Sequence, residues 1–368
     1  MSTTADAIFR HFHPVCVSAS ITDKPVRVVL ADRPIVLFRS HGDIVALDDD
    51  CPHRRAPLSY GTVSNGRLHC AYHGWNFGAD GQASVPLQPT LKCAVRSYTV
   101  ADRLGYVWVA APGTPLSRLP DFIAPAESLG GKWDGCHRMA PISLLFQAPL
   151  PQTLDNFGEV EHVPFVHKVL GWSIEDVPRM TVEMTAGPDY TEAKGWGPQR
   201  RPHTRLLRLL DKYVLRCGDT SLLEWDMKFS PLHTTFMPGW GDPATGERRA
   251  FSVRATSVFV PETATTTRLI NFPFVKIHER RLRAIVPVVK YVARTSLLQE
   301  LMLDRQACEM VASVPNSIED MRLGVRDKQL IMNRKLLYRL YLGSEMPDSL
   351  PTSDVESVRQ PLRGVHAS

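Results

Sequence analysis

Long apolar runs are absent from this sequence of 368 residues. One of the longest, Leu282–Ala293, is interrupted by Arg, Pro and Lys, and it falls far short of the ~20 apolar residues that a membrane helix needs. The first twenty residues contain Arg10, His11 and His13, where a secretory signal peptide needs an unbroken apolar segment. The sequence therefore predicts a cytoplasmic protein without a membrane span.

The sequence also has few cysteines and only a small excess of positive charge. Seven cysteines, an odd number spread thinly over the chain, do not make a disulfide framework, and this favours metal binding as their role. The net charge is +5, but the 43 basic residues are dispersed among 38 acidic ones and form no tract, which argues against a nucleic-acid partner. Neither a G-x-G-x-x-G turn after a strand nor a P-loop occurs, so the sequence shows no nucleotide site.

The composition and length are those of a globular protein with two domains, because 43% of the residues are hydrophobic and 22% are charged. Short β-branched runs separated by turn residues predict a small all-β domain over residues 1–115. Pro and Gly then punctuate the segment from Ala111 to Gly131, which indicates a linker and a domain boundary near residue 116. The first domain is expected to contain strands at Val26–Leu30, Ile35–Phe38, Ile44–Leu47 and Tyr106–Ala110.

The second predicted domain, residues 116–345, combines strands with two late helices, Tyr291–Val314 and Met321–Leu342. This order predicts an α+β domain with an antiparallel sheet. Residues 346–368 mix Pro, Ser and Asp and are expected to form a tail. The strands of the second domain are expected at Ile142–Gln147, Met180–Met184, Leu222–Phe229, Phe251–Val260 and Thr265–Phe274.

Two cysteines and two histidines form the most specific pattern in the first domain. Cys51 and His53 are separated by one residue, and after sixteen intervening residues follow Cys70 and His73, which are separated by two. A zinc site is one interpretation, since two cysteines and two histidines are a common zinc ligand set. In an extended segment, however, Cys51 and His53 would project to the same face and could reach two neighbouring irons. Cys70 and His73 could do the same, which favours a [2Fe-2S] cluster of the Rieske type, with cysteines on one iron and histidines on the other.

The segment around these ligands also resembles the Rieske non-heme iron oxygenases. The resemblance covers Cys51–Phe77 (CPHRRAPLSYGTVSNGRLHCAYHGWNF), with Arg54, Gly61 and Gly74-Trp75 where such proteins usually have them. Rieske clusters also occur in pure electron carriers, so the second domain has to decide whether the chain is an enzyme. For that domain the resemblance implies a helix-grip-like fold.

A second metal site is indicated in the second domain. His162 and His167 lie in the segment Asn156–His167, which resembles the family signature N-x-x-D-x-x-H-x4-H. In the family these histidines hold a mononuclear Fe(II) together with one carboxylate, and this ligand set leaves one face of the metal open for O2. The resemblance thus makes His162 and His167 iron ligands.

The third ligand is expected on the late helix. Leu303–Glu309 resembles the family's D-x4-E helix, in which the Asp is the ligand, and this indicates Asp304. Asp304 also lies among apolar residues, where a carboxylate needs a partner such as a metal. Glu309 and Glu300 are the alternatives for this position.

Position 159 departs from the family pattern, because Glu159 stands where the family usually has Asp. In the family this carboxylate bridges a cluster histidine of one subunit to an iron histidine of the next. Here the corresponding bridge would join His73 to His162, and it implies a head-to-tail homotrimer. The alternative is a solvated Glu159, with Glu161 or Asp155 in its place.

The resemblance implies a terminal oxygenase, a Rieske non-heme iron monooxygenase. With O2 and two externally supplied electrons it would insert one oxygen atom into a C–H bond of a small cyclic, heterocyclic or methylated substrate, giving hydroxylation or oxidative N- or O-demethylation. It further implies a separate NAD(P)H-dependent reductase or ferredoxin, for which Arg54, Arg55 and Arg67 could form a docking patch unless they are merely scattered solvated arginines. The alternative function is a non-catalytic Rieske electron carrier with a ligand-binding domain.

One strand raises a further question about the substrate pocket. Trp225, Met227 and Phe229 alternate along Leu222–Phe229, so all three face the same side. This pattern favours core packing, and a pocket lining is the alternative.

Overall fold

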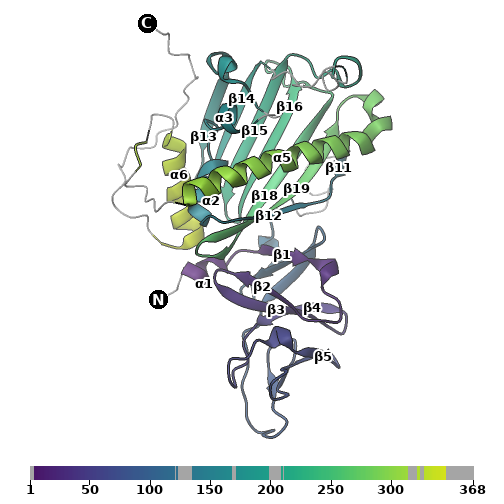
Figure 1. The fold of residues 1–368 in the computed structure, drawn as a ribbon, viewed down its shortest axis with the longest axis vertical. Coiled ribbons are helices and arrows are strands. Elements are labelled where there is room, and N and C mark those ends of the chain that lie inside the picture. The colour runs from purple at the N-terminus through teal and green to yellow at the C-terminus, as the bar shows by residue number, and fades with distance from the viewer. Residues whose placement is uncertain are drawn as a thin grey trace. The chain divides into compact units, whose positions relative to one another are not determined.

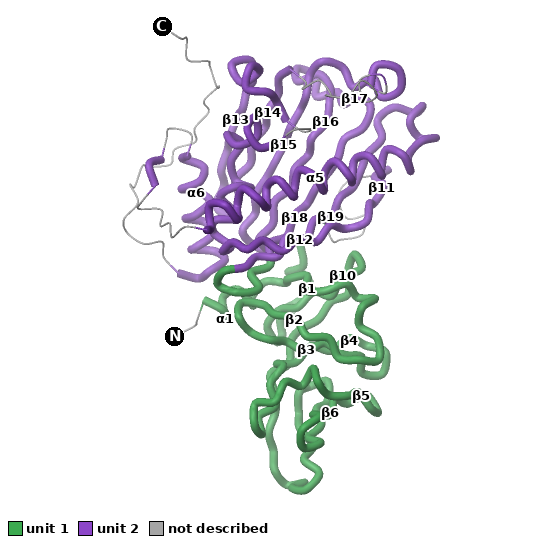
Figure 2. Tube along the Cα trace, viewed as in Figure 1, with its two compact units in different colours: residues 1–125, 260–265 green, residues 126–259, 266–368 purple. Residues whose placement is uncertain are grey.

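The structure is a computed structural model. It describes residues 4–120, 122, 135–167, 171–198, 209, 211–313, 321–323 and 327–344. The chain divides into two compact units (Figure 2): unit 1 comprises residues 1–125 and 260–265, and unit 2 comprises residues 126–259 and 266–368. The predicted domain limits, with a boundary near residue 116, stay a prediction, and the predicted tail 346–368 lies outside the described residues.

Unit 1 consists of small antiparallel sheets. Their strand orders are β1-β10-β9, β2-β3-β4 and β5-β6-β7-β8. The predicted strands Val26–Leu30 and Tyr106–Ala110 coincide with β2 and β10. The elements are α1 (Thr4–Ile8), β1 (His13–Val17), β2 (Val26–Leu30), β3 (Arg33–Ser40), β4 (Asp43–Asp48), β5 (Thr62–Ser64), β6 (Arg67–His69), β7 (Asn76–Phe77), β8 (Ala83–Ser84), β9 (Thr99–Arg103) and β10 (Tyr106–Ala110).

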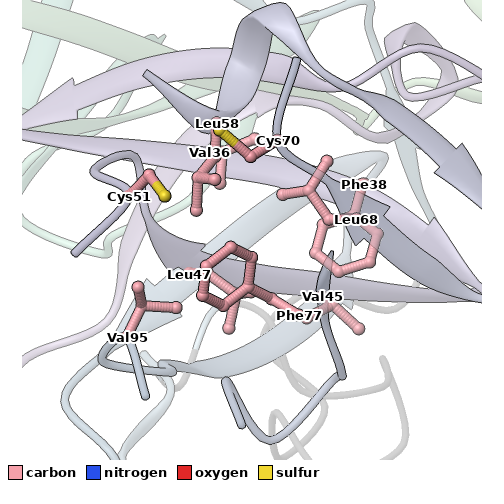
Figure 3. Close-up of a cluster of buried hydrophobic side chains, with 10 residues drawn as sticks. All are labelled: Val36, Phe38, Val45, Leu47, Cys51, Leu58, Leu68, Cys70, Phe77 and Val95. Carbon is pink, nitrogen blue, oxygen red and sulfur yellow. The ribbon is translucent and has the colours of Figure 1, made fainter. Parts of the chain in front are cut away.

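Cys51, His53, Cys70 and His73, here called the cluster motif, are held in place by an Asn-Gly turn and an apolar core. Asn65 and Gly66 have φ values of 51° and 70°, the left-handed conformation that a two-residue hairpin between β5 and β6 requires. Leu68 and Phe77 of this sheet pack into a core that also contains Cys51 and Cys70, as Figure 3 shows. The two cysteines therefore approach each other within an apolar environment.

Unit 2 is built on a nine-stranded antiparallel sheet, and Figure 1 shows the long helix α5 crossing one face of it. The main strand order is β11-β19-β18-β16-β15-β14-β13, with β12 beside β19 and β17 beside β16. The strands are β11 (Cys136–Arg138), β12 (Ile142–Phe146), β13 (Thr181–Ala186), β14 (Tyr190–Pro198), β15 (Thr220–Phe229), β16 (Leu232–Gly241), β17 (Arg248–Arg249), β18 (Phe251–Thr263) and β19 (Thr266–Ile277). The α-helices are α2 (Leu150–Phe157), α3 (Val163–Val166), α5 (Val286–Ala312) and α6 (Lys328–Leu336). The α+β fold with an antiparallel sheet is thus confirmed.

Helix α5 begins earlier than the predicted helix 291–314, because Pro287 is tolerated in the first turn, where its missing N–H has no partner to lose. The predicted helix 321–342 is described only in part, as α6 followed directly by the π-helical segment Leu337–Leu342. Among the described residues, no helix combines the length and the apolar character that crossing a membrane would require.

Candidate metal centres

The two halves of the cluster motif form two turns with the same pattern of backbone hydrogen bonds. The N–H of Cys51 donates to the carbonyl of Ala56 at 2.9 Å, and the N–H of Cys70 donates to the carbonyl of Trp75 at 2.7 Å. Each cysteine carbonyl then accepts an N–H from four residues on, Arg55 at 2.8 Å and Gly74 at 3.1 Å. Cys51 and His53 therefore lie in a turn, and their expected extended conformation was wrong.

These turns bring all four predicted cluster residues together in unit 1. Cys51 and Cys70 are buried, with 2% and 4% of their surface exposed. His53 and His73 are exposed, and their ring centroids are 4.4 Å apart. Trp75 stacks on His53 with centroids 4.7 Å apart and planes 1° apart, which fixes the orientation of that imidazole.

The donor set fits a two-iron cluster with one buried end and one exposed end. Burial, and after it the neighbouring Cys70, raises the pKa of the Cys51 thiol above its ordinary value. Thiolates at such a position need a strong cation, and iron or zinc supplies one. Two exposed imidazoles beside two buried thiols match the division of ligands between the irons of a Rieske cluster.

The second site lies in unit 2, where His162, His167 and Asp304 come together. The Nε2 atoms of the two histidines are 3.1 Å apart. Oδ1 of Asp304 lies 3.4 Å from Nε2 of His162 and 3.3 Å from Nε2 of His167. Two ligand atoms bound at about 2.1 Å to one metal and at right angles to each other are about 3 Å apart. The three atoms therefore fit one face of a single ion.

The short helix α3 and the long helix α5 present these ligands. His162 and His167 flank α3, and Asp304 comes from the middle of α5. Glu159 holds the turn that leads into α3, because its Oε2 accepts the N–H of His162 at 3.2 Å and also that of Glu161. Residues five apart thus face each other across one helical turn.

Each histidine has a carboxylate on its other ring nitrogen. Oε1 of Glu159 contacts Nδ1 of His162, and Oε2 of Glu300 lies 2.5 Å from Nδ1 of His167. Asn156 donates to Oδ1 of Asp304 at 2.9 Å. Carboxylates in these positions fix the tautomer that leaves Nε2 free to bind a metal, and they raise the basicity of the imidazole.

The charges of the site call for a cation between the two rings. Burial by itself would lower the pKa of His162 and His167, but hydrogen bonds to Asp304 and to the two glutamates raise it to about 9. At Asp304 burial opposes ionisation, yet the two histidines lower the pKa of its carboxyl to about 2. Three carboxylates therefore stabilise positive charge here, and a divalent metal can supply it in place of protons.

A buried ion pair supports the helix that carries Asn156. Arg334 of α6 donates from Nε to Oδ1 of Asp155 at 2.7 Å and from Nη2 to Oδ2 at 2.5 Å. Asn333 donates to the carbonyl of Gly158 at 3.4 Å and accepts from the Thr191 hydroxyl at 2.7 Å. Helix α6 thus anchors α2 and the loop that follows it.

A cavity of about 140 Å³ opens beside the three ligands. Its lining is mostly apolar and includes four aromatic side chains: Phe157, Trp172, Phe236 and Trp240. Trp225, Met227 and Phe229 are buried and are not among the lining residues, so core packing is their role. The cavity is the space next to the candidate metal in which a small molecule would bind.

The remaining sequence candidates lie elsewhere. The carboxylate of Glu309 accepts the N–H of Gln147 at 3.0 Å instead of approaching the histidines. Glu161 is exposed, and Asp155 is paired with Arg334. Sequence reasoning missed Asn156 and Glu300 as partners of the ligands. An Asn in the signature and a Glu one helical turn before Asp304 were the available signals.

The arginines near the cluster do not share one role. Arg67 is held internally, because it donates to Oδ1 and the carbonyl of Asn76 and to the carbonyl of Gln82. Arg55 is 81% exposed and pairs with Asp50. Arg54 and Arg55 thus remain the candidates for a docking patch.

Comparison with known proteins agrees with this geometry. Residues 11–99 match the Rieske [2Fe-2S] domain family. The chain is 33% identical to Protein TIC 55 of Pisum sativum over 192 residues, which is 48% of this chain but only 33% of that protein. It is 27% identical to the oxygenase component of dicamba O-demethylase from Stenotrophomonas maltophilia over 256 residues, which is 66% of this chain and 71% of that one.

The fold is also similar to a solved structure over nearly its whole length. The crystal structure of dicamba monooxygenase bound to dicamba superimposes with a TM-score of 0.68 and 20% identity, covering 91% of this chain and 97% of that one. At this identity the likeness concerns the fold. The chain thus carries a Rieske [2Fe-2S] domain and is a relative of the Rieske oxygenases in sequence and in fold.

Proposed function

We infer that the chain is the terminal oxygenase of a multicomponent system, a Rieske non-heme iron monooxygenase acting on small cyclic, heterocyclic or methylated substrates. One observation carries this inference: the Nε2 atoms of His162 and His167 and a carboxylate oxygen of Asp304 meet at the edge of a largely apolar cavity. A pure electron carrier has no use for a second metal site beside a small-molecule cavity.

The reaction converts one C–H bond, O2, two electrons and two protons into one C–O–H group and one water. Fe(II) bound at this site would supply a redox-active centre that reacts with O2. His162, His167 and Asp304 hold it, while Glu159 and Glu300 orient the imidazoles. The apolar cavity excludes water from the substrate. A hydroxylated N- or O-methyl group would then collapse to release the demethylated product.

The two electrons would come from outside the chain, and Cys51, His53, Cys70 and His73 would hold the cluster that stores one of them. The relative named as an "oxygenase component" supports a separate NAD(P)H-dependent reductase or ferredoxin. Glu159 already holds His162, and in the proposal its carboxylate links to His73 of a second copy in a head-to-tail homotrimer. The proposed location of this system is the cytoplasm.

The test is incorporation of labelled oxygen. Protein loaded with iron and supplied with a surrogate reductase is screened against small aromatic, heterocyclic and methyl-ether compounds under ¹⁸O2, with mass analysis of products and assay of formaldehyde. We expect ¹⁸O in a hydroxylated product, or formaldehyde with a demethylated product, and neither with Asp304→Ala. Reduction and reoxidation of the cluster with no product across the whole screen would favour the electron carrier.

A further inference from the structure

One polar pair interrupts the apolar lining of the cavity in unit 2. Asn271 of β19 and Ser257 of β18 both line the cavity, and each has only 1% of its surface exposed. The amide nitrogen of Asn271 donates to the Ser257 hydroxyl at 2.8 Å. This bond uses one of the two polar atoms of the Asn271 side chain.

The other polar atom, Oδ1 of Asn271, accepts no hydrogen bond from the part of the chain that the structure describes. Leaving such an acceptor buried and unpaired destabilises a protein, which is why native proteins seldom do so. A hydroxyl that accepts from Asn271 also keeps its own proton available as a donor. Both residues line the cavity, so an occupant that reaches the pair meets one acceptor and one donor.

The surroundings indicate the chemistry of the occupant. Among the described lining residues none is Lys or Arg, so away from His162, His167 and Asp304 no cationic side chain is available to pair with an anionic group. Burying an unpaired charge among these apolar side chains would be costly. The volume of about 140 Å³ is close to that of an apolar cavity of about 150 Å³ that binds benzene. A neutral molecule with a single ring fits these limits.

We propose that Asn271, supported by Ser257, is a specificity-determining residue that recognises an N–H or O–H donor on a neutral, single-ring substrate. This assignment rests on the proposed function, since it places that substrate beside His162, His167 and Asp304. The donor satisfies Oδ1 of Asn271, while the aromatic lining contacts the ring. A ring without a donor leaves the acceptor unpaired and binds more weakly.

Three ring compounds test the assignment by binding alone. Aniline carries an N–H donor, toluene replaces it with a methyl group of similar size, and benzonitrile carries only an acceptor. Dissociation constants are measured by titration calorimetry on the iron-loaded protein without reductant. The variants are Asn271→Leu, which keeps the size of the side chain, and Thr256→Val as control. Thr256 is equally buried on β18, but it bonds to Thr235 instead of lining the cavity.

We expect Asn271→Leu to weaken aniline binding about 10-fold while toluene binds as well or better, since the N–H donor of aniline then has no acceptor in the apolar cavity. Thr256→Val should change neither constant. An unchanged preference for aniline in Asn271→Leu would overturn the assignment, as would a loss confined to benzonitrile, which would mean that the amide presents its NH2 group. Because no turnover is needed, failure of this test leaves the oxygenase proposal intact, and a chain that binds no third iron can still show the preference.

Discussion

The buried ion pair between Asp155 and Arg334 should be costly to break. The side chains of Asp155 and Arg334 are only 15% and 10% exposed, and they make two parallel hydrogen bonds. Burial raises the pKa of Asp155 even with Arg334 beside it, so this carboxylate is poorly solvated. In Arg334→Leu the negative charge of Asp155 is left without a partner.

Removing one partner of a buried ion pair costs about 3–5 kcal/mol. In a domain of 150–250 residues, each 1 kcal/mol lowers the melting temperature by about 2–4 °C, so Arg334→Leu should lower it by roughly 6–20 °C. Arg179→Leu is the matched control, because Arg179 is 64% exposed in its pair with Asp176, and pairs of this kind contribute about 0–1 kcal/mol. The double variant Asp155→Asn with Arg334→Leu should recover part of the loss.

The assay is thermal unfolding followed by circular dichroism, with the visible spectrum of the cluster recorded in parallel. The Rieske spectrum should persist in Arg334→Leu below the transition, because all four cluster residues lie in unit 1. The reasoning is refuted if Arg334→Leu melts no lower than Arg179→Leu, since Asp155 would then be solvated well enough to stand alone.

Three further changes test other parts of the account. Cys51→Ser should abolish the [2Fe-2S] absorption while iron still binds in unit 2, and zinc in a colourless wild-type protein would contradict the cluster. Glu159→Gln should retain both metals but slow turnover about 10-fold or more, whereas Glu159→Asp keeps the charge and should stay active; equal activity in wild type and Gln would refute the bridge. Arg55 has a φ of 61°, the conformation that Gly74 adopts in the matching turn. This left-handed conformation is strained for arginine, so Arg55→Gly should raise the free energy of unfolding of unit 1 by ~0.5–1 kcal/mol, measured by urea denaturation. A lower free energy of unfolding in the variant would show that Arg55 is not strained.

Prediction from the sequence succeeds best for features whose residues lie close together in the chain. The four cluster residues fall within Cys51–His73, and the Asn-Gly turn that pairs β5 with β6 can be identified from two residues. The conformation of the turns was mistaken, because positive φ at Arg55 could not be expected from a residue type that rarely adopts it.

Strands β14 and β16 were missed for a physical reason. The buried face of β14 consists of Thr191, Ala193, Gly195 and Gly197, and β16 contains Pro238 and two glycines. Small residues give a weak hydrophobic alternation, and Gly and Pro suggest turns. Packing against neighbouring strands overrides these preferences.

Contacts between distant segments lie beyond sequence reasoning. Asn156 bonds to Asp304 across 148 positions, and nothing in the spacing of either residue indicates that bond. The same holds for Asn271, whose partner comes from the neighbouring strand and whose unpaired oxygen becomes evident only once the cavity is known. Which residues act as metal ligands stays a prediction that the geometry supports.

The count of iron atoms per chain tests the central claim most directly. Anaerobically reconstituted wild type, Asp304→Ala and Cys51→Ser are analysed by elemental analysis for iron, zinc and sulfide. Two metal centres predict three irons and two sulfides in wild type, two irons with an intact Rieske spectrum in Asp304→Ala, and one iron in Cys51→Ser. Two irons in both wild type and Asp304→Ala would contradict a mononuclear site formed by His162, His167 and Asp304.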